Sequence, residues 1–224
     1  MTPVTVGGDP ARVDYYVRAA EPWITGAEAP WDLAQVLERA LQSYAGRPWG
    51  ASVVNEGLVR GDVYAGEGVV IQPGAKVFGP AVLEAGSFVG SNAFLRNGVF
   101  LGRGARVGHS SEVKASLVME HALITHFNYV GDSWIGADVQ VGAHVTLSNT
   151  KVSNQPRIRF FPGGREHRTE LEYFGAMIGD RAVVGAQVVL QPGTLLGPDA
   201  VIHPHMLVGG FVPAGQELRS GGPR

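Results

Sequence analysis

Aliphatic residues recur at every sixth position along a large part of the chain. In the first run, each aliphatic residue is followed four positions later by a mostly small one. The aliphatic positions are Ile71, Val77, Leu83, Val89, Leu95, Leu101, Val107 and Val113, and the positions four later are Ala75, Ala81, Ser87, Ala93, Val99, Ala105, Ser111 and Leu117. An amphipathic helix has a period near 3.6 residues and an alternating strand a period of 2, so neither explains this pattern.

The same period continues through the C-terminal half, with its register slipping by one residue twice. The later aliphatic positions are Val118, Ile124 and Val130, then Ile135, Val141 and Leu147, and after an interruption Ile178, Val184, Leu190, Leu196, Ile202 and Val208. A short-period repeat predicts a solenoid in which each unit buries its apolar side on the next. We therefore expect residues 51–224 to form an all-β, parallel β-helix with three short faces and about 18 residues per coil, the coils stacking about 4.8 Å apart.

Residues 1–50 lack the repeat and contain one helical pattern. Leu33, Val36, Leu37, Ala40, Leu41 and Tyr44 follow the i, i+3, i+4, i+7 spacing of an amphipathic helix. Pro30 and Gly46 suit its start and end. We expect a helix over about 31–44 within an N-terminal cap that blocks the exposed strand edges at one end of the solenoid.

The repeat is interrupted at residues 150–175, "TKVSNQPRIRFFPGGREHRTELEYFG". The turn signal Pro162-Gly163-Gly164 between two polar and aromatic stretches predicts a hairpin or long loop ejected from the coil. The loop is rich in basic residues, namely Arg157, Arg159, Arg165, His167 and Arg168. It is either a solvated hairpin or a flap that meets an anionic ligand or a neighbouring subunit.

Composition narrows the function classes. The chain has 224 residues, 45% of them hydrophobic, and a formal net charge of −2. Near-neutral charge argues against a general nucleic-acid surface. There is no cysteine, hence no thiolate metal site or cysteine nucleophile. With no apolar signal-peptide core and no apolar stretch of about 20 residues, we expect a cytoplasmic protein without a membrane partner.

Two cations stand out because a β-helix face does not require them. Arg96 and Lys114 are 18 residues apart, one expected coil, and each directly follows an inward aliphatic residue. This phase places them one above the other, about 5 Å apart at the backbone. Stacked like charges repel unless an anion lies between them, and a phosphate would suit both side chains. Two exposed charges splayed into water are the alternative.

A third polar position lies in "LITHFNYVGDS", Leu123–Ser133. His126 follows Lys114 by 12 residues, or two faces of a coil, and Tyr129, Asp132 and Asn149 come on the following turns. A single histidine is a weak signal, and this one gains weight only through its placement near the two cations.

From Phe94 to Ala186 the chain resembles the left-handed β-helix acetyltransferase domain of the bifunctional N-acetylglucosamine-1-phosphate uridyltransferase/glucosamine-1-phosphate acetyltransferase family. It also resembles β-helix domains of related sugar-phosphate nucleotidyltransferase-like proteins. The matching stretches are "FLRNG", "VGHSSEVKAS", "THFNYVGDSWIG", "VGAHVTLSN" and "GAMIGDRAVVGA". The resemblance implies a left-handed helix and a homotrimer with sites between subunits. We expect residues 1–50 to contain no counterpart of the family's nucleotidyltransferase domain, because 50 residues are too few to form one.

The resemblance also implies roles. Arg96 and Lys114 would hold a sugar phosphate, Tyr129 and Asn149 would position the sugar, and Ala143 and Ala186 would border the acyl donor, acetyl-CoA. His126 would be the general base that deprotonates the attacking amine, a task for which imidazole is suited near neutral pH. No metal is expected.

Departures from the family keep other functions open. Gln140, His144, Tyr173 and Ala186 stand where the family has Asn, Gly, Lys and Ser. Because these positions concern the acyl donor more than the sugar phosphate, the chain is an acetyltransferase or a non-catalytic sugar-phosphate or nucleotide-sugar binding subunit of a nucleotidyltransferase system. A third reading is a zinc protein resembling γ-carbonic anhydrases, with His121 and His126 five residues apart and His109 as a third ligand.

Overall fold

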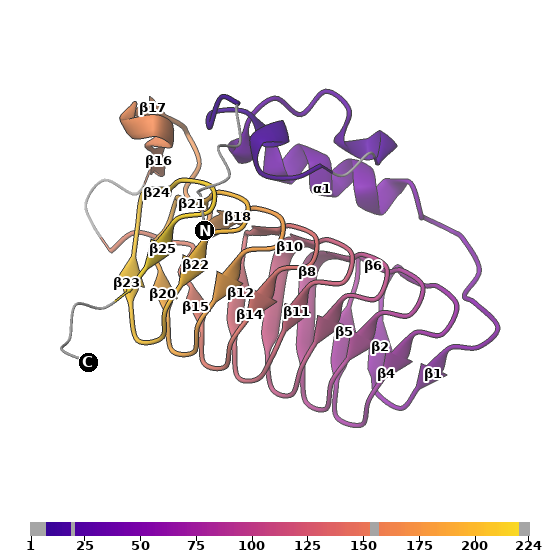
Figure 1. Cartoon of the computed structure of the whole chain (residues 1–224). Coiled ribbons are helices and arrows are strands. Elements are labelled where there is room, and N and C mark those ends of the chain that lie inside the picture. Colours follow the sequence, from indigo (N-terminus) through magenta and orange to yellow (C-terminus); the bar gives the residue numbers. More distant parts are fainter. Residues whose placement is uncertain (1–7, 19–20, 153–156, 220–224) are drawn as a thin grey trace.

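The computed structural model describes residues 8–18, 21–152 and 157–219. The chain from residue 54 winds into a left-handed parallel β-helix whose coils stack along one axis (Figure 1). The first face contains β2 (Leu58–Arg60), β5 (Lys76–Phe78), the first halves of β8 (Phe94–Leu101) and β10 (Glu112–Val118), β12 (Tyr129–Gly131), β15 (Thr146–Leu147), β20 (Val189–Leu190) and β23 (Leu207–Val208).

The other two faces complete each coil. The second contains β3 (Val63–Ala65), β6 (Ala81–Leu83), the second halves of β8 and β10, β13 (Trp134–Ile135), β18 (Ala176–Ile178), β21 (Thr194–Leu196) and β24 (Phe211–Val212). The third contains β1 (Val54–Asn55), β4 (Val70–Ile71), β7 (Phe88–Val89), β9 (Arg106–Val107), β11 (Leu123–Ile124), β14 (Gln140–Val141), β19 (Val183–Val184), β22 (Val201–Ile202) and β25 (Glu217–Leu218).

The period-six aliphatic residues form the core of the β-helix, as predicted. From Ile71 to Val208, every residue of that set is buried, and together they make one continuous cluster along the axis. Leu117 is an exception among the positions expected to be small and inward. It is buried, but it packs on the outside of the second face, and Ser116 occupies the inward position instead.

The first slip in the repeat has a local cause at one corner of the coil. Asn97 and Gly98 separate the two halves of β8, whereas Ala115 alone separates those of β10, so the register shifts between Lys114 and Ser116. The coil is thereby one residue shorter. Buried serines bond the backbone where it tightens, because Ser116 Oγ donates to the Lys114 carbonyl at 2.7 Å and accepts from the Ser133 N–H at 3.0 Å.

A parallel arrangement at another corner explains Asn128 in the "HFNY" stretch. The Asn128 side chain is buried, and its Oδ1 accepts a hydrogen bond of 2.7 Å from the Val145 N–H of the next coil. The Asn128 N–H in turn donates to Ser111 Oγ at 3.1 Å. Asn128 therefore holds successive coils together, and it serves structure rather than a ligand.

The N-terminal segment covers the second face rather than an end of the solenoid. It contains the 3-10 turns η1 (Val13–Tyr15), η2 (Pro22–Ile24) and η3 (Pro30–Asp32), followed by α1 (Leu33–Gln42), close to the predicted 31–44. Helix α1 runs along the β-helix axis (Figure 1). The outward side chains of the second face are apolar, and they pack with the helix in one cluster that includes Val82, Phe100, Leu117, Trp134, Met177 and Leu195. The prediction that this segment caps an end of the solenoid was therefore wrong. The segment instead buries the apolar outward side chains of the second face, and removing that surface from water is favourable.

Asp180 fastens this segment to the β-helix. Its two carboxylate oxygens accept hydrogen bonds of 2.9 Å from the backbone N–H groups of Arg18 and Ala137, and its own N–H donates to the Tyr16 carbonyl at 2.8 Å. Burial raises the pKa of the Asp180 carboxyl, while the two N–H donors favour its charged form.

The interruption at 150–175 contains the predicted hairpin, in which β16 (Arg159–Phe160) pairs antiparallel with β17 (His167–Arg168) around the 3-10 turn η4 (Pro162–Gly164). Phe160 is buried and packs edge-on against Phe174, with ring centroids 4.8 Å apart. The basic side chains are largely paired within the hairpin, Arg157 with Glu170 and Glu172, and Arg159 and Arg168 with Glu166. No helix among the described residues is long and apolar enough to cross a bilayer.

Phe100 tests whether the N-terminal segment is an integral part of the fold. Its fully buried ring contacts Trp23 at 4.8 Å and Tyr44 at 6.2 Å between centroids. We expect Phe100→Ala to lower the free energy of unfolding by about 3–5 kcal/mol. The measurement is chemical denaturation followed by tryptophan fluorescence, with Phe161→Ala, at a 41% exposed ring, as the control. Equal stability of the two variants would show that the segment is not packed as described.

Candidate functional site

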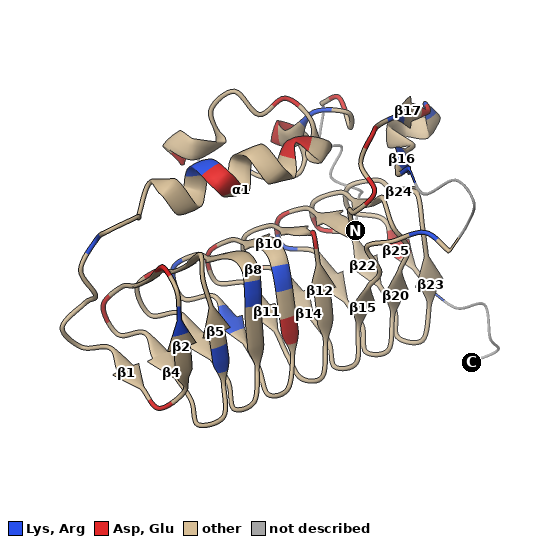
Figure 2. Cartoon of the chain, turned by 180° about the vertical axis from the view of Figure 1, so that it is seen from behind, with Lys and Arg blue, Asp and Glu red and all other residues tan. Residues whose placement is uncertain are grey.

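The first face carries the cations that the sequence singled out. Arg96 on β8 and Lys114 on β10 are direct register partners, which confirms that they stack on adjacent coils. Both point outward, because the neighbouring Leu95 and Val113 fill the core. Figure 2 shows basic residues on successive strands of this face, β2, β5, β8 and β10.

Each of the two cations has a carboxylate partner that sequence reasoning missed. Arg96 bonds Glu112 at 2.7 Å, and Lys114 Nζ bonds Asp132 Oδ2 at 2.7 Å. The Lys114–Asp132 pair is the more enclosed, with side chains 16% and 17% exposed. The stacked like charges are therefore balanced within the chain, and a bound anion is not needed to make the stack stable.

Asp132 is the centre of a small polar network. The same oxygen, Oδ2, that bonds Lys114 also accepts a hydrogen bond of 2.5 Å from Asn149 Nδ2. Tyr129 completes the group, because a Cβ atom at Gly131 would lie 2.7 Å from the Tyr129 hydroxyl and 3.0 Å from Asn149 Nδ2. The absence of a side chain at Gly131 thus lets Tyr129 and Asn149 approach each other beside the Lys114–Asp132 pair.

The hairpin contributes an aromatic residue to this network. Lys114 Nζ lies 5.0 Å from the ring centroid of Tyr173, which is 54% exposed. This distance permits a cation–π interaction. Tyr173 follows the hairpin directly, so the interruption in the repeat delivers a side chain to the same polar cluster.

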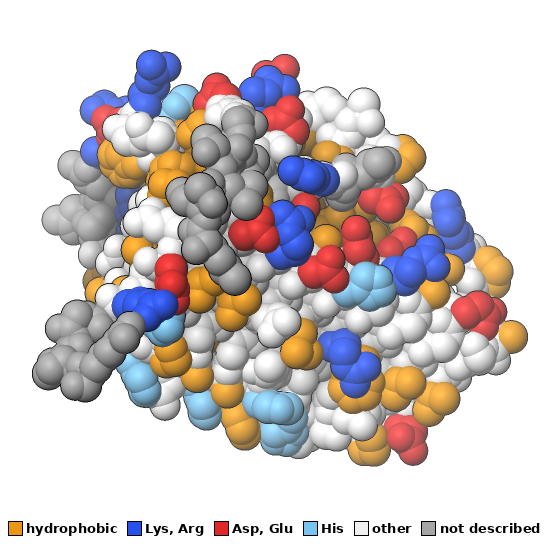
Figure 3. Space-filling model, in the orientation of Figure 1, with side chains coloured by type: hydrophobic (Ala, Val, Ile, Leu, Met, Phe, Trp, Pro, Cys, Tyr) orange, Lys and Arg blue, Asp and Glu red, His pale blue; other side chains and the backbone are white. Residues whose placement is uncertain are grey.

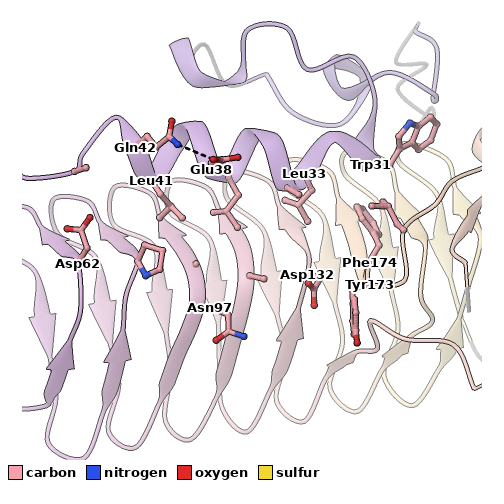
Figure 4. Close-up of a pocket in the computed structure, with 17 residues that line it drawn as sticks. Trp31, Leu33, Glu38, Leu41, Gln42, Asp62, Asn97, Asp132, Tyr173 and Phe174 are labelled. Carbon is pink, nitrogen blue, oxygen red and sulfur yellow. Dashed lines mark hydrogen bonds between the residues drawn. The ribbon is translucent and has the colours of Figure 1, made fainter.

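Next to this cluster lies an apolar groove of about 620 Å³, between one side of α1 and the β-helix. Asp132 and Tyr173 line its end nearest the polar network, and Leu33 and Leu41 of α1 line its wall (Figure 4). Its floor is the corner at which Asn97, Gly98 and Ala115 adopt positive φ. The sequence pattern did not predict this groove, because it depends on where α1 docks.

His126 lies at the opposite edge of the first face, at the corner between β11 and β12, and is exposed. Backbone hydrogen bonds of 2.9–3.0 Å connect this corner from coil to coil through the carbonyls of His109, His126, Ala143 and Ala186. We call these four residues the corner ladder. The structure therefore places Ala143 and Ala186 on the two coils that follow His126, at the same corner. Histidine side chains gather along this lower edge of the molecule in Figure 3.

The residues next to the ladder form an aromatic stack. The rings of Phe127 and His144 are nearly parallel, with centroids 5.0 Å apart and planes at 10°, and His109 meets Phe127 edge-on at 5.2 Å. The imidazole of His144, whose bulk departs from the family pattern, is thus held against Phe127.

Of the three histidines in the zinc hypothesis, His121 lies away from His109 and His126. His121 belongs to a different corner, where its N–H donates to the Arg103 carbonyl at 2.9 Å. Across residues 8–18, 21–152 and 157–219, no group of three or more His, Asp or Glu side chains is arranged to hold a metal ion.

Fold and repeat together define a left-handed β-helix protein of the hexapeptide-repeat class. The family profile described as "Hexapeptide repeat of succinyl-transferase" matches residues 80–108 and 175–203. Among solved structures, the UDP-N-acetylglucosamine acyltransferase from Campylobacter jejuni superposes with a TM-score of 0.56 and 18% sequence identity, covering 74% of this chain and 69% of that one.

The chain is also similar in sequence to curated bifunctional proteins. The chain is 32% identical over 179 residues to the bifunctional protein GlmU of Methanococcus vannielii, covering 80% of this chain and 42% of the relative. It is 30% identical over 187 residues to the bifunctional sugar-1-phosphate nucleotidylyltransferase/acetyltransferase of Sulfurisphaera tokodaii, covering 84% and 46%. The chain thus spans less than half the length of these relatives.

The enclosure of the Lys114–Asp132 pair predicts a strong energetic coupling. We expect a coupling energy above about 1 kcal/mol in a double-mutant cycle with Lys114→Met and Asp132→Asn, measured by chemical denaturation. The reason is that the changes in unfolding free energy caused by substituting contacting residues are not additive. The matched control is Arg181–Asp199, which also spans 18 residues at 2.7 Å but is 44% and 38% exposed. Exposed pairs contribute about 0.2–1 kcal/mol. Equal couplings would contradict the network described here.

Proposed function

We propose that the chain is an acyl-CoA-dependent N-acetyltransferase acting on an amino-sugar 1-phosphate or a related sugar phosphate. The observation that carries the proposal is the composition of one face. Stacked Arg96 and Lys114, with Tyr129 and Asn149 beside them, share this face with His126 at its edge, and these are the residues to which the resemblance to the sugar-phosphate acetyltransferases gives the acceptor and base roles.

In this mechanism His126 acts as the general base. As the amine nitrogen of the sugar attacks the thioester carbonyl, a C–N bond forms and His126 accepts the proton of the amine. Collapse of the tetrahedral intermediate breaks the C–S bond, and the CoA sulfur leaves with a proton returned by His126. Binding both reactants on one rigid face contributes much of the rate, because it converts a bimolecular encounter into a local reaction.

The cations hold the acceptor. Arg96 offers a planar fork and Lys114 a compact charge for phosphate oxygens. Their carboxylate partners orient them before the substrate arrives, and the phosphate then shares or displaces those contacts. Tyr129 and Asn149 lie where the sugar hydroxyls would be and supply both donors and acceptors.

The acyl donor would lie along the corner ladder. Ala143 and Ala186 are small, and they occupy the coils directly after His126. The Phe127–His144 contact holds the imidazole ring of His144 in a stack at this edge. Acetyl-CoA supplies the activated acetyl group, and the residues of this chain orient it toward the amine. We further propose a homotrimer, in which a neighbouring subunit completes the cleft over this face.

A second candidate function is a non-catalytic sugar-phosphate or nucleotide-sugar binding subunit that acts with a nucleotidyltransferase. The specific observation in its favour is that two of the departures from the family lie on the proposed donor side, whereas Tyr173 departs beside Lys114. His144 and Ala186 depart at the edge that would meet the donor, while Arg96, Lys114, Tyr129 and Asn149 are all present on the acceptor side.

Thiol release tests the acetyltransferase directly. With acetyl-CoA and glucosamine 1-phosphate, then other amino-sugar phosphates, we expect amine-dependent CoA release that His126→Ala lowers at least about 100-fold through loss of the base. His121→Ala, an exposed histidine at another corner, should retain activity. Light scattering should give the same mass for both variants. Full activity in His126→Ala would remove the base assignment, and sugar-phosphate binding without release from any amine would favour the binding subunit.

Gly131 tests the acceptor pocket without touching a charged group. A methyl group there would displace Tyr129 and Asn149, so we expect Gly131→Ala to weaken glucosamine 1-phosphate binding at least tenfold in calorimetry. Gly209→Ala is the matched control, since Gly209 has the same position on a later coil and its Cβ would displace the Gln191 side chain rather than a residue of the proposed acceptor site. Similar affinity in both variants would place the acceptor elsewhere.

A further inference from the structure

The basic row on the first face extends beyond Arg96 and Lys114 by two coils. Arg60 on β2 is the register partner of Phe78 on β5, and Lys76 on β5 is the partner of Phe94 on β8. All four side chains stand at outward positions of the same face that holds the proposed acceptor site. Basic residues on β2 and β5 continue the row of Figure 2 toward the N-terminal end of the solenoid.

These two additional cations differ from the first two in their partners. Arg96 and Lys114 each bond a carboxylate, whereas neither Arg60 nor Lys76 forms an ion pair with any residue in the described ranges. Both are exposed. No ion pair within the described ranges neutralises either cation, so an anion bound to them would not have to displace a carboxylate.

Aromatic rings alternate with the cations on this part of the face. Phe78 and Phe94 are half-buried and meet edge-on, with centroids 5.2 Å apart. The Arg60 guanidinium carbon is 5.7 Å from the Phe78 ring centroid, compared with 4.1 Å for Arg106 over Phe88 on the third face. Arg60 thus lies farther from its ring than Arg106 does, and its side chain is exposed and able to meet a ligand.

The order of chemical groups along the face matches the order of groups in one ligand class. From the C-terminal to the N-terminal coils come Asn149, Tyr129, Lys114 and Arg96, then Lys76 and Phe78 together on β5, and last Arg60 on β2. We propose that this face binds a nucleoside-diphosphate amino sugar, with the sugar at Tyr129, the diphosphate along Lys114, Arg96 and Lys76, and the nucleoside against Phe78 and Arg60. The spacing agrees, because five coils at about 4.8 Å span about 19 Å, the scale of an extended nucleotide sugar.

The inference rests on the proposed amine acceptor and makes it more specific, since a sugar monophosphate would leave Lys76, Arg60 and Phe78 without a role. The shared chemistry is a nucleoside diphosphate, and CoA also contains one. The linear order favours the acceptor as its source, because the nucleotide part begins at the phosphate-binding cations rather than at the corner ladder.

Calorimetry on the full chain tests the inference in the absence of turnover. The probes are UDP-glucosamine, UDP, glucosamine 1-phosphate and CoA. We expect UDP-glucosamine to bind at least tenfold more tightly than glucosamine 1-phosphate. The double variant Arg60→Ala/Lys76→Ala should lower the affinity for UDP-glucosamine and UDP at least tenfold, while that for glucosamine 1-phosphate changes less than twofold. Phe78→Leu should lower only the nucleotide affinities, through weaker stacking.

Arg106→Ala is the matched control, because it removes an arginine beside a phenylalanine on a different face, and it should change none of these affinities. Loss of CoA affinity in the double variant, with UDP-glucosamine unchanged, would assign the nucleotide to the donor and overturn the proposal. A changed oligomer mass with unchanged affinities would make this surface a subunit contact and overturn it as well. Because binding is read directly, a chain that binds UDP-glucosamine but releases no thiol would sustain this inference while the proposed acetyl transfer failed.

Discussion

The stacking of each inward aliphatic residue on its counterpart in the next coil is the constraint from which the rest of the structure follows. Side chains alternate sides along a strand, so a slip of one residue would turn the buried set outward. Backbone hydrogen bonds between coils then fix the register to the residue, as between Val113 and Leu95 or Val130. Every outward position consequently has a defined coil and face, and a side chain there is placed with the precision of the backbone.

The outward positions of the faces carry different kinds of side chain. The second face carries outward apolar residues such as Phe100 and Trp134, which are stable only when covered, and α1 supplies the cover. The first face is not covered by α1 and can therefore hold charges and half-buried rings. The short corner at Ala115 lies where the first and second faces meet. Ala115 lines the groove beside α1, and so does Asp132, the carboxylate partner of Lys114.

The sequence predicted what depends on periodicity and missed what depends on docking. The buried aliphatic set and the stacking of Arg96 on Lys114 follow from counting residues, and both are confirmed. The course of α1 along a face did not follow, because an amphipathic stripe shows that a helix is covered but not by which surface. Leu117 was misplaced for a related reason, since the corner that shortens at Ala115 moves the next residues by one position. The carboxylates Glu112 and Asp132 were visible as residues, and the same 18-residue count that stacked the cations would have placed Glu112 on Phe94, two positions from Arg96, and Asp132 one coil from Lys114.

The two ends of the first face differ in how their cations are paired: Arg96 and Lys114 form ion pairs, whereas Arg60 and Lys76 form none among the described residues. Lys114 and Asn149 both donate hydrogen bonds to Asp132, so their side chains are already oriented before a ligand binds. An anionic ligand there must compete with the Asp132 carboxylate for the Lys114 ammonium group. Where Arg60 and Lys76 form no ion pair among the described residues, a ligand does not have to displace a paired carboxylate but must order two exposed side chains. An anion with a single phosphate can use only one of these regions. A longer anion gains orientation at one end and unpaired cations at the other, and it is the kind of ligand for which four cations on successive coils of one face are best suited.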